Sequence, residues 1–130
     1  MGIYFYEKFA LETTIYYNNY MAIASDSIIK RAKNFFDNGS YNLAIIVLAE
    51  LDNTDKNASD LKYNMLLDIA TKSRIAKDYQ TVISAYEELE KMTPYNEKLL
   101  TCIGLTYENN KEYDKALLYY EKILNINKRN

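Results

Sequence analysis

"IGLTYENNKEYDKALLYYEKIL", residues 103–124, is the stretch that decides the fold. It holds two runs of apolar residues spaced three and four apart, separated by the polar break ENNKE at 108–112. This spacing places the apolar side chains of each run on one face of a helix. A break of this length leaves room only for an antiparallel turn. The stretch therefore predicts two amphipathic helices packed side by side.

The same pattern occurs twice more, 34 residues earlier and then a further 38 residues earlier. A recurring period of this size is the mark of a helical repeat protein. Arg31 is the one mismatch in size or polarity. The four extra residues fall within the polar segment 53–60, where either the connection lengthens or the next helix gains a turn. The repeating positions are Leu100, Ile103, Gly104, Tyr113, Ala116, Tyr120 and Ile123; Leu66, Ile69, Ala70, Tyr79, Val82, Tyr86 and Leu89; and Ile28, Arg31, Ala32, Tyr41, Ala44, Leu48 and Leu51.

Small residues mark the places where the two helices of a unit are expected to cross. A small side chain allows two helix backbones to approach closely, and a tyrosine near the turn would fill the wedge between them. Gly39 is expected to end the first helix, because glycine adopts the left-handed conformation without a penalty. The small pairs are Ala32 with Ala44, Ala70 with Val82 and Gly104 with Ala116, and the wedge tyrosines are Tyr41, Tyr79 and Tyr113.

These positions resemble the tetratricopeptide repeat family. The resemblance is carried most completely by LLTCIGLTYENNKEYDKALLYYEKILNINK at 99–128 and by LLDIATKSRIAKDYQTVISAYEELEKMTP at 66–94. The chain departs from the family pattern in having no tryptophan at the first aromatic position, Arg31 in the first unit and Ser73 in the second. The resemblance implies an all-α solenoid, in which antiparallel helix pairs stack into a superhelix.

The expected organisation is a single domain with an extra helical segment at its N-terminus. Residues 1–24 form this extension, and we expect it to cap the first pair. The repeats then occupy 25–56, 63–96 and 97–130, with a connection at 57–62. The residues expected to pack the extension against the first pair are Phe5, Phe9, Ile15, Tyr16, Tyr20 and Ile23.

The amino-acid composition excludes most kinds of catalytic and cofactor-binding site. The 130 residues include no histidine, one cysteine and three glycines, and the net charge is -2. Histidine dyads, thiolate metal clusters and phosphate-binding loops are excluded, and the charge does not suit nucleic acid. We expect no enzyme, no cofactor, no metal and no membrane span, in a cytoplasmic protein. Cys102 is interpreted as packing, and Glu87 is expected to pair with Lys91 on a solvated helix face.

The resemblance also implies where a partner protein or peptide binds. Family members use the concave surface formed by the first helix of each pair. Lys33, Arg74 and Lys98 would receive acidic groups there. A clamp for chaperone carboxylates is not expected, because Asp68 would repel the carboxylate. The groove positions are Ile29, Lys33, Phe36, Asn64, Leu67, Thr71, Arg74, Lys98, Thr101, Leu105 and Glu108.

The prediction is thus a non-catalytic scaffold that binds a partner peptide or helix in a concave groove. The alternative is a structural subunit of a larger assembly or a homo-oligomer, held through its end faces. A solenoid requires polar caps, and no capping helix follows the third unit in this sequence. The positions expected at this end face are Leu118, Tyr119, Ile123 and Ile126.

Overall fold

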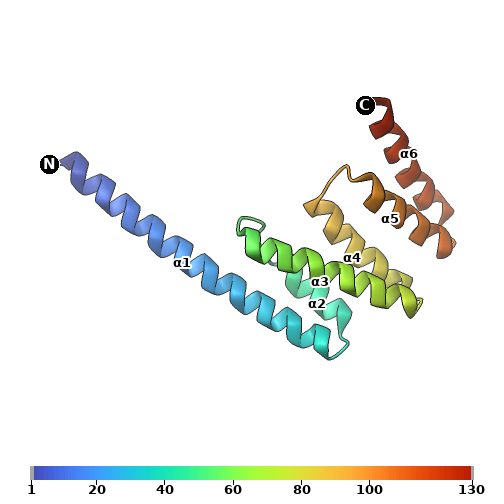
Figure 1. The fold of residues 1–130 in the computed structure, drawn as a ribbon, viewed down its shortest axis with the longest axis horizontal. Coiled ribbons are helices and arrows are strands. Elements are labelled where there is room, and N and C mark those ends of the chain that lie inside the picture. The colour runs from blue at the N-terminus through green and yellow to red at the C-terminus, as the bar shows by residue number, and fades with distance from the viewer. Residues whose placement is uncertain (1, 130) are drawn as a thin grey trace.

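The computed structural model describes residues 2–129, and it contains helices and no strand within that range. Each helix contacts the next along the chain across a short turn, which produces three consecutive pairs (Figure 1). The all-α arrangement of repeated pairs is therefore confirmed. The helices are α1 (Gly2–Asp37), α2 (Tyr41–Ala49), α3 (Lys56–Ile75), α4 (Tyr79–Met92), α5 (Glu97–Asn109) and α6 (Tyr113–Arg129).

The turn inside each pair has the same geometry three times. Gly39, Lys77 and Lys111 adopt left-handed backbone angles, with φ of 77°, 62° and 63°. In the first turn the amide of Gly39 donates to Phe36 O at 3.0 Å and that of Ser40 donates to Phe35 O at 2.8 Å. The other two turns repeat both bonds, which is the pattern that ends a helix after a left-handed residue. The expected role of Gly39 is confirmed, and two lysines fill the equivalent positions.

The core runs through all three pairs. The small residues predicted at the helix crossings are all buried, and Ala32 and Ala44 are fully inaccessible. Large side chains such as Leu48, Leu66 and Ile103 fill the space around them, each with no exposed surface. The prediction fails for Tyr113, which is 62% exposed. No further helix packs beside α6 in residues 2–129 to cover it, whereas the ring of Tyr41 packs against that of Phe36 at an angle of 55°, with the centroids 5.6 Å apart.

Residues 57–62, which were expected as a connection, belong to α3 instead. Asp55 begins this helix by accepting hydrogen bonds from the amides of Asn57 and Ala58, at 3.0 and 3.5 Å. Ala58 and Lys62 are then buried, and the Lys62 Nζ atom donates to Leu51 O at 3.4 Å. A capped start and a buried face both stabilise a helix. The extra residues between the first two units are thus accommodated by lengthening α3, the second of the two possibilities raised by the spacing.

Residues 2–24 continue α1 as one helix and do not fold back over the first pair. This N-terminal arm, residues 2–24 of α1, extends away from the other helices (Figure 1). The side chains that were expected to pack on the first pair are between 50% and 75% exposed. The expected packing is therefore wrong, since nothing breaks α1 between the arm and Asp37 and a continuous helix cannot turn back.

Candidate functional site

The predicted groove positions on α3 form one exposed stripe. Asn64, Leu67, Thr71 and Arg74 recur at helical spacing on the side opposite the buried residues of this helix. Leu67 is 37% exposed, and the Thr71 hydroxyl donates to Leu67 O at 2.9 Å. Lys33 is exposed on the neighbouring helix α1. The stripe combines one apolar side chain with amide, hydroxyl and cationic groups.

Phe36, another predicted groove position, lies where α1, α2 and α3 meet. Its ring packs against Tyr41 of α2, and the Nζ atom of Lys72 on α3 lies 4.8 Å from its centroid. A cation over an aromatic face is attracted by the ring quadrupole. Phe36 is half-buried as a result, and it joins the first two units. Ile29 is also half-buried, on the same helix.

The groove positions on α5 are separated from those on α3. Lys98, Thr101, Leu105 and Glu108 are exposed along one side of α5, and Leu105 is 47% exposed. At the backbone level, α5 comes close to α4 only among the earlier helices, so α3 and α5 have no backbone contact within residues 2–129. By contrast, α1 contacts α3 directly. The eleven positions therefore divide into a set on α1 and α3 and a set on α5.

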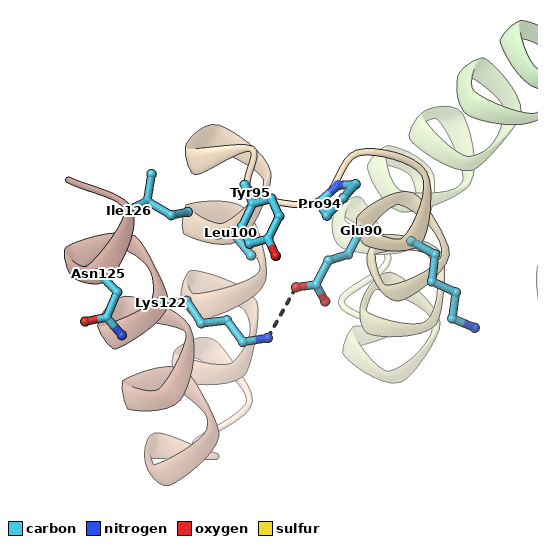
Figure 2. A pocket seen from close by; sticks show the side chains of 8 residues that line it. Glu90, Pro94, Tyr95, Leu100, Lys122, Asn125 and Ile126 are labelled. Carbon is cyan, nitrogen blue, oxygen red and sulfur yellow. Dashed lines mark hydrogen bonds and ion pairs between the residues drawn. The ribbon is translucent and has the colours of Figure 1, made fainter. Parts of the chain in front are cut away.

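A pocket of about 530 Å³ opens between α4, α5 and α6. Leu100 and Ile126 contribute apolar surface, and Tyr95 lies beside them from the connection between α4 and α5 (Figure 2). Glu90 on α4 and Lys122 on α6 point toward each other across the opening, with the Lys122 Nζ atom 3.3 Å from Glu90 Oε2 (Figure 2). The pocket thus has an apolar wall and a charged rim.

Two tyrosines connect this rim to the neighbouring carboxylates. The Tyr119 hydroxyl donates to Glu90 Oε1 at 3.1 Å, and the Tyr107 hydroxyl donates to Glu87 Oε1 at 3.2 Å. Burial and the adjacent Glu87 carboxylate raise the pKa of Tyr107 to about 12. Burial and Glu90 likewise raise the pKa of Tyr119. A phenol beside a carboxylate stays protonated because its ionised form would be repelled, so both hydroxyls act as donors.

The expected pairing of Glu87 with Lys91 is wrong. The Nζ atom of Lys91 contacts Glu88 Oε1 at 2.9 Å, one turn away on the same helix. Glu87 instead accepts the bond from Tyr107 on α5. The carboxylates of α4 are also less solvated than expected, because the side chains of Glu88 and Glu90 are only 14% and 23% exposed.

Three of the residues predicted at the end face, Tyr119, Ile123 and Ile126, recur at helical spacing along one side of α6, and Leu118 lies beside them. Tyr119 and Ile126 are half-buried on the side of α6 toward α4, and Ile123 is half-buried as well. Only Leu118, at 58%, is widely exposed. The open apolar surface of α6 includes Leu117 and Leu124, which are 56% and 59% exposed.

Sequence reasoning did not single out Tyr95, Leu100 or Lys122 as site residues. Lys122 contacts Glu90, although the two residues are 32 positions apart in the sequence. The periodicity of one helix carries no information about the distance of that helix from another. The only available signal was the apolar spacing on α6, which placed Tyr119 and Ile126 on a face that needed covering. It did not indicate that α4 covers it.

The comparisons with known proteins agree with this architecture. Residues 97–130, which comprise α5 and α6, match a family model described as tetratricopeptide repeat. The six paired helices are consistent with repeats of that kind. No curated protein matches the chain. In the part of the chain that the structure describes, no helix has both the length and the apolar character needed to cross a bilayer.

Proposed function

We propose, from the tetratricopeptide repeat at residues 97–130 and the two helix pairs that precede it, that this protein is a non-catalytic cytoplasmic scaffold that binds a partner peptide. Repeats of this family generally mediate contacts between proteins. The stripe on α3 and Lys33 of α1 supply the main contact surface. The positions on α5 extend this surface for a longer partner.

The exposed stripe of α3 is the observation that carries this proposal. Leu67 presents an apolar surface. Arg74 places a cation about two helical turns further along the same side of the helix. Guanidinium groups bind carboxylates through paired donors, and a few residues near the centre of a contact, arginine often among them, commonly supply most of the binding energy. We therefore expect a partner segment that carries both acidic and apolar side chains.

The test is selection of short peptides from a random displayed library on the immobilised chain, followed by titration of the enriched peptides. Arg74→Glu and Leu67→Lys are each expected to weaken binding by about tenfold or more, because one important contact contributes more than 1 kcal/mol. Glu121→Gln, on the remote helix α6, is the control and should leave binding unchanged. Enriched peptides that bind both groove variants with unchanged affinity would refute this surface.

The second candidate is a subunit held in an assembly through its end. It is favoured by Leu117 and Leu124, which are more than half exposed on α6. Apolar surface left exposed on a helical repeat favours contact with another surface. Conversion of both residues to lysine should abolish self-association if this face is the contact. Unchanged association of the double variant would exclude it.

A further inference from the structure

The N-terminal arm carries an apolar seam that is exposed along its whole length. Its positions alternate in steps of three and four, the spacing of helices that pack along each other. No charged residue lies on the seam, because Glu7, Lys8 and Glu12 fall at other heptad positions. The seam consists of Tyr6, Phe9, Thr13, Tyr16, Tyr20 and Ile23.

The seam is confined to the arm. Further along the same side of α1, the positions that continue it are Ser27, Lys30 and Asn34, and all three are exposed polar residues. Burial of α1 against its own chain begins at Ser25, which is 7% exposed. The apolar surface thus ends where the packed part of the chain starts, so it serves a contact that the rest of this chain does not make.

The arm also needs a partner to remain helical. Residues 13–20, TTIYYNNY, are all poor helix formers. In proteins most of the stability of a helix comes from tertiary packing of one face and not from the propensity of its residues. Because residues 4–20 of the arm are all exposed, they gain no such packing, and contact with another surface would stabilise them.

We propose that this surface is the arm of a second copy, paired antiparallel along the seam to form a dimer. One register places Tyr6 opposite Ile23 of the second copy, and it places Phe9 opposite Tyr20 and Thr13 opposite Tyr16. Tyr6, Thr13 and Tyr20 share one heptad position, and Phe9, Tyr16 and Ile23 share the other. Each layer of the antiparallel pair then contains one residue of each kind. The antiparallel direction sets the two packed bodies at opposite ends and opposes the helix dipoles favourably. The inference is independent of the peptide surface proposed above.

The polar residue in the seam is compatible with this burial. The hydroxyl of Thr13 donates to Phe9 O at 2.9 Å. A buried hydroxyl that is already bonded avoids most of the cost of leaving water. Thr13 can therefore enter the centre of the pairing without losing a hydrogen-bond partner.

The exposed surface of the seam side chains is large enough for a dimer contact. The five large seam side chains are between 63% and 75% exposed. With on the order of 200 Å² for each fully exposed side chain, they would bury roughly 700 Å² per copy. Two copies would bury about 1,400 Å², which lies within the range of specific protein contacts.

The charges of the arm argue against a lipid surface as the partner. Helices that lie on membranes carry many basic residues on their polar face. The arm has one basic residue, Lys8, against Glu7 and Glu12. It also has no continuous polar face, since Leu11, on the side opposite the seam, is 61% exposed.

The first test is sedimentation equilibrium of the full chain over a concentration series. We expect a mass twice the 15.2 kDa of the chain, falling to the monomer mass in the variant Phe9→Glu/Tyr20→Glu. Leu11→Glu is the matched control, since it introduces the same charge on the opposite side of the arm and should remain dimeric. Circular dichroism should show that the double variant loses helix, whereas its urea transition persists because the repeats stay folded.

The second test fixes the direction of the pairing. In a Cys102→Ser background, a mixture of Thr13→Cys and Tyr16→Cys chains should form a disulfide between the two kinds of chain on mild oxidation. A parallel pair would instead link like chains in each separate sample. A monomeric wild-type chain, a mass that keeps growing with concentration, or binding of the monomer to anionic vesicles would each overturn the proposal.

Discussion

At the scale of single residues, Gly104 shows how closely α5 and α6 approach. A Cβ atom added there would lie 2.6 Å from Cε1 of Tyr120 and 3.1 Å from its Cδ1. The half-buried ring would have to move, and overpacking costs about 1 to 3 kcal/mol. Alanine recovers only about 0.5 to 1 kcal/mol of helix propensity. We therefore expect Gly104→Ala to lower the free energy of unfolding, as measured by urea denaturation.

A double-mutant cycle separates the cost of overpacking against Tyr120 from the gain in helix propensity. In a Tyr120→Ala background the ring is gone, so Gly104→Ala should raise stability by about 0.5 to 1 kcal/mol. The sign of the effect thus reverses between the two backgrounds. A destabilisation of equal size in both would show that Tyr120 is not the obstacle.

The repeat spacing identified Gly104 as a contact point, but it paired this residue with Ala116. Both are buried, and the spacing was sufficient for that conclusion because small residues recur where helices cross. The aromatic ring that covers the glycine could not be predicted. Its position depends on the rotamer of Tyr120, whose hydroxyl donates to Glu108 Oε2 at 3.3 Å, and a periodic pattern does not determine rotamers.

At the scale of helices, Glu90 joins α4 to α6, which have no backbone contact of their own. Its two oxygens accept from Tyr119 and Lys122. Glu90→Gln removes the ion pair and weakens the bond from Tyr119. A partly exposed pair of this kind contributes about 0.2 to 1 kcal/mol. We expect a loss of this order in unfolding free energy and faster amide hydrogen exchange in α6.

The matched control is Glu121→Gln, which removes a carboxylate from the exposed side of α6. It should leave exchange in α6 unchanged. If both variants accelerate exchange equally, helix charge and not the link to α4 is responsible. Tyr119→Phe should reproduce part of the Glu90→Gln effect, since it removes one of the same two bonds.

Helix boundaries within the pairs were predictable from the sequence, whereas contacts between units were not. The predicted break at 108–112 and the predicted helix end at Gly39 match the observed turns, because residues unfavourable to a helix interrupt a strong helical period there. The sequence did not predict that α1 is continuous through residue 24. The arm is apolar on several sides, and amphipathic spacing alone does not distinguish a helix that folds back from one that extends.

At the scale of the whole molecule, the two junctions between units differ. The second unit contacts the first through three helix pairings, α1 with α3, α2 with α3 and α2 with α4. Thr81 adds a hydrogen bond to Asn42 Oδ1 at 3.0 Å across this junction. The third unit contacts the second through α4 and α5 alone at the backbone level. The predicted groove positions on α5 are separated from those on α3 for the same reason.

This asymmetry predicts that α5 and α6 open before α3 and α4. In repeat proteins stability is approximately the sum of unit and junction contributions, so a weaker junction permits partial unfolding. Native-state hydrogen exchange should give opening free energies for α5 and α6 lower by about 1 to 2 kcal/mol than those for α3 and α4. Leu100→Ala, at a residue 3% exposed on α5, should then accelerate exchange in α5 and α6 only.

Leu66→Ala provides the comparison, because Leu66 lies at the centre of α3 with no exposed surface. Truncation of a fully buried leucine costs about 2 to 5 kcal/mol. Since the second unit supports both neighbours, this change should accelerate exchange in all six helices. Equal opening free energies throughout the wild-type chain, with Leu100→Ala acting on every helix alike, would mean that the third unit is held as firmly as the second and that its separation from α3 has no energetic consequence.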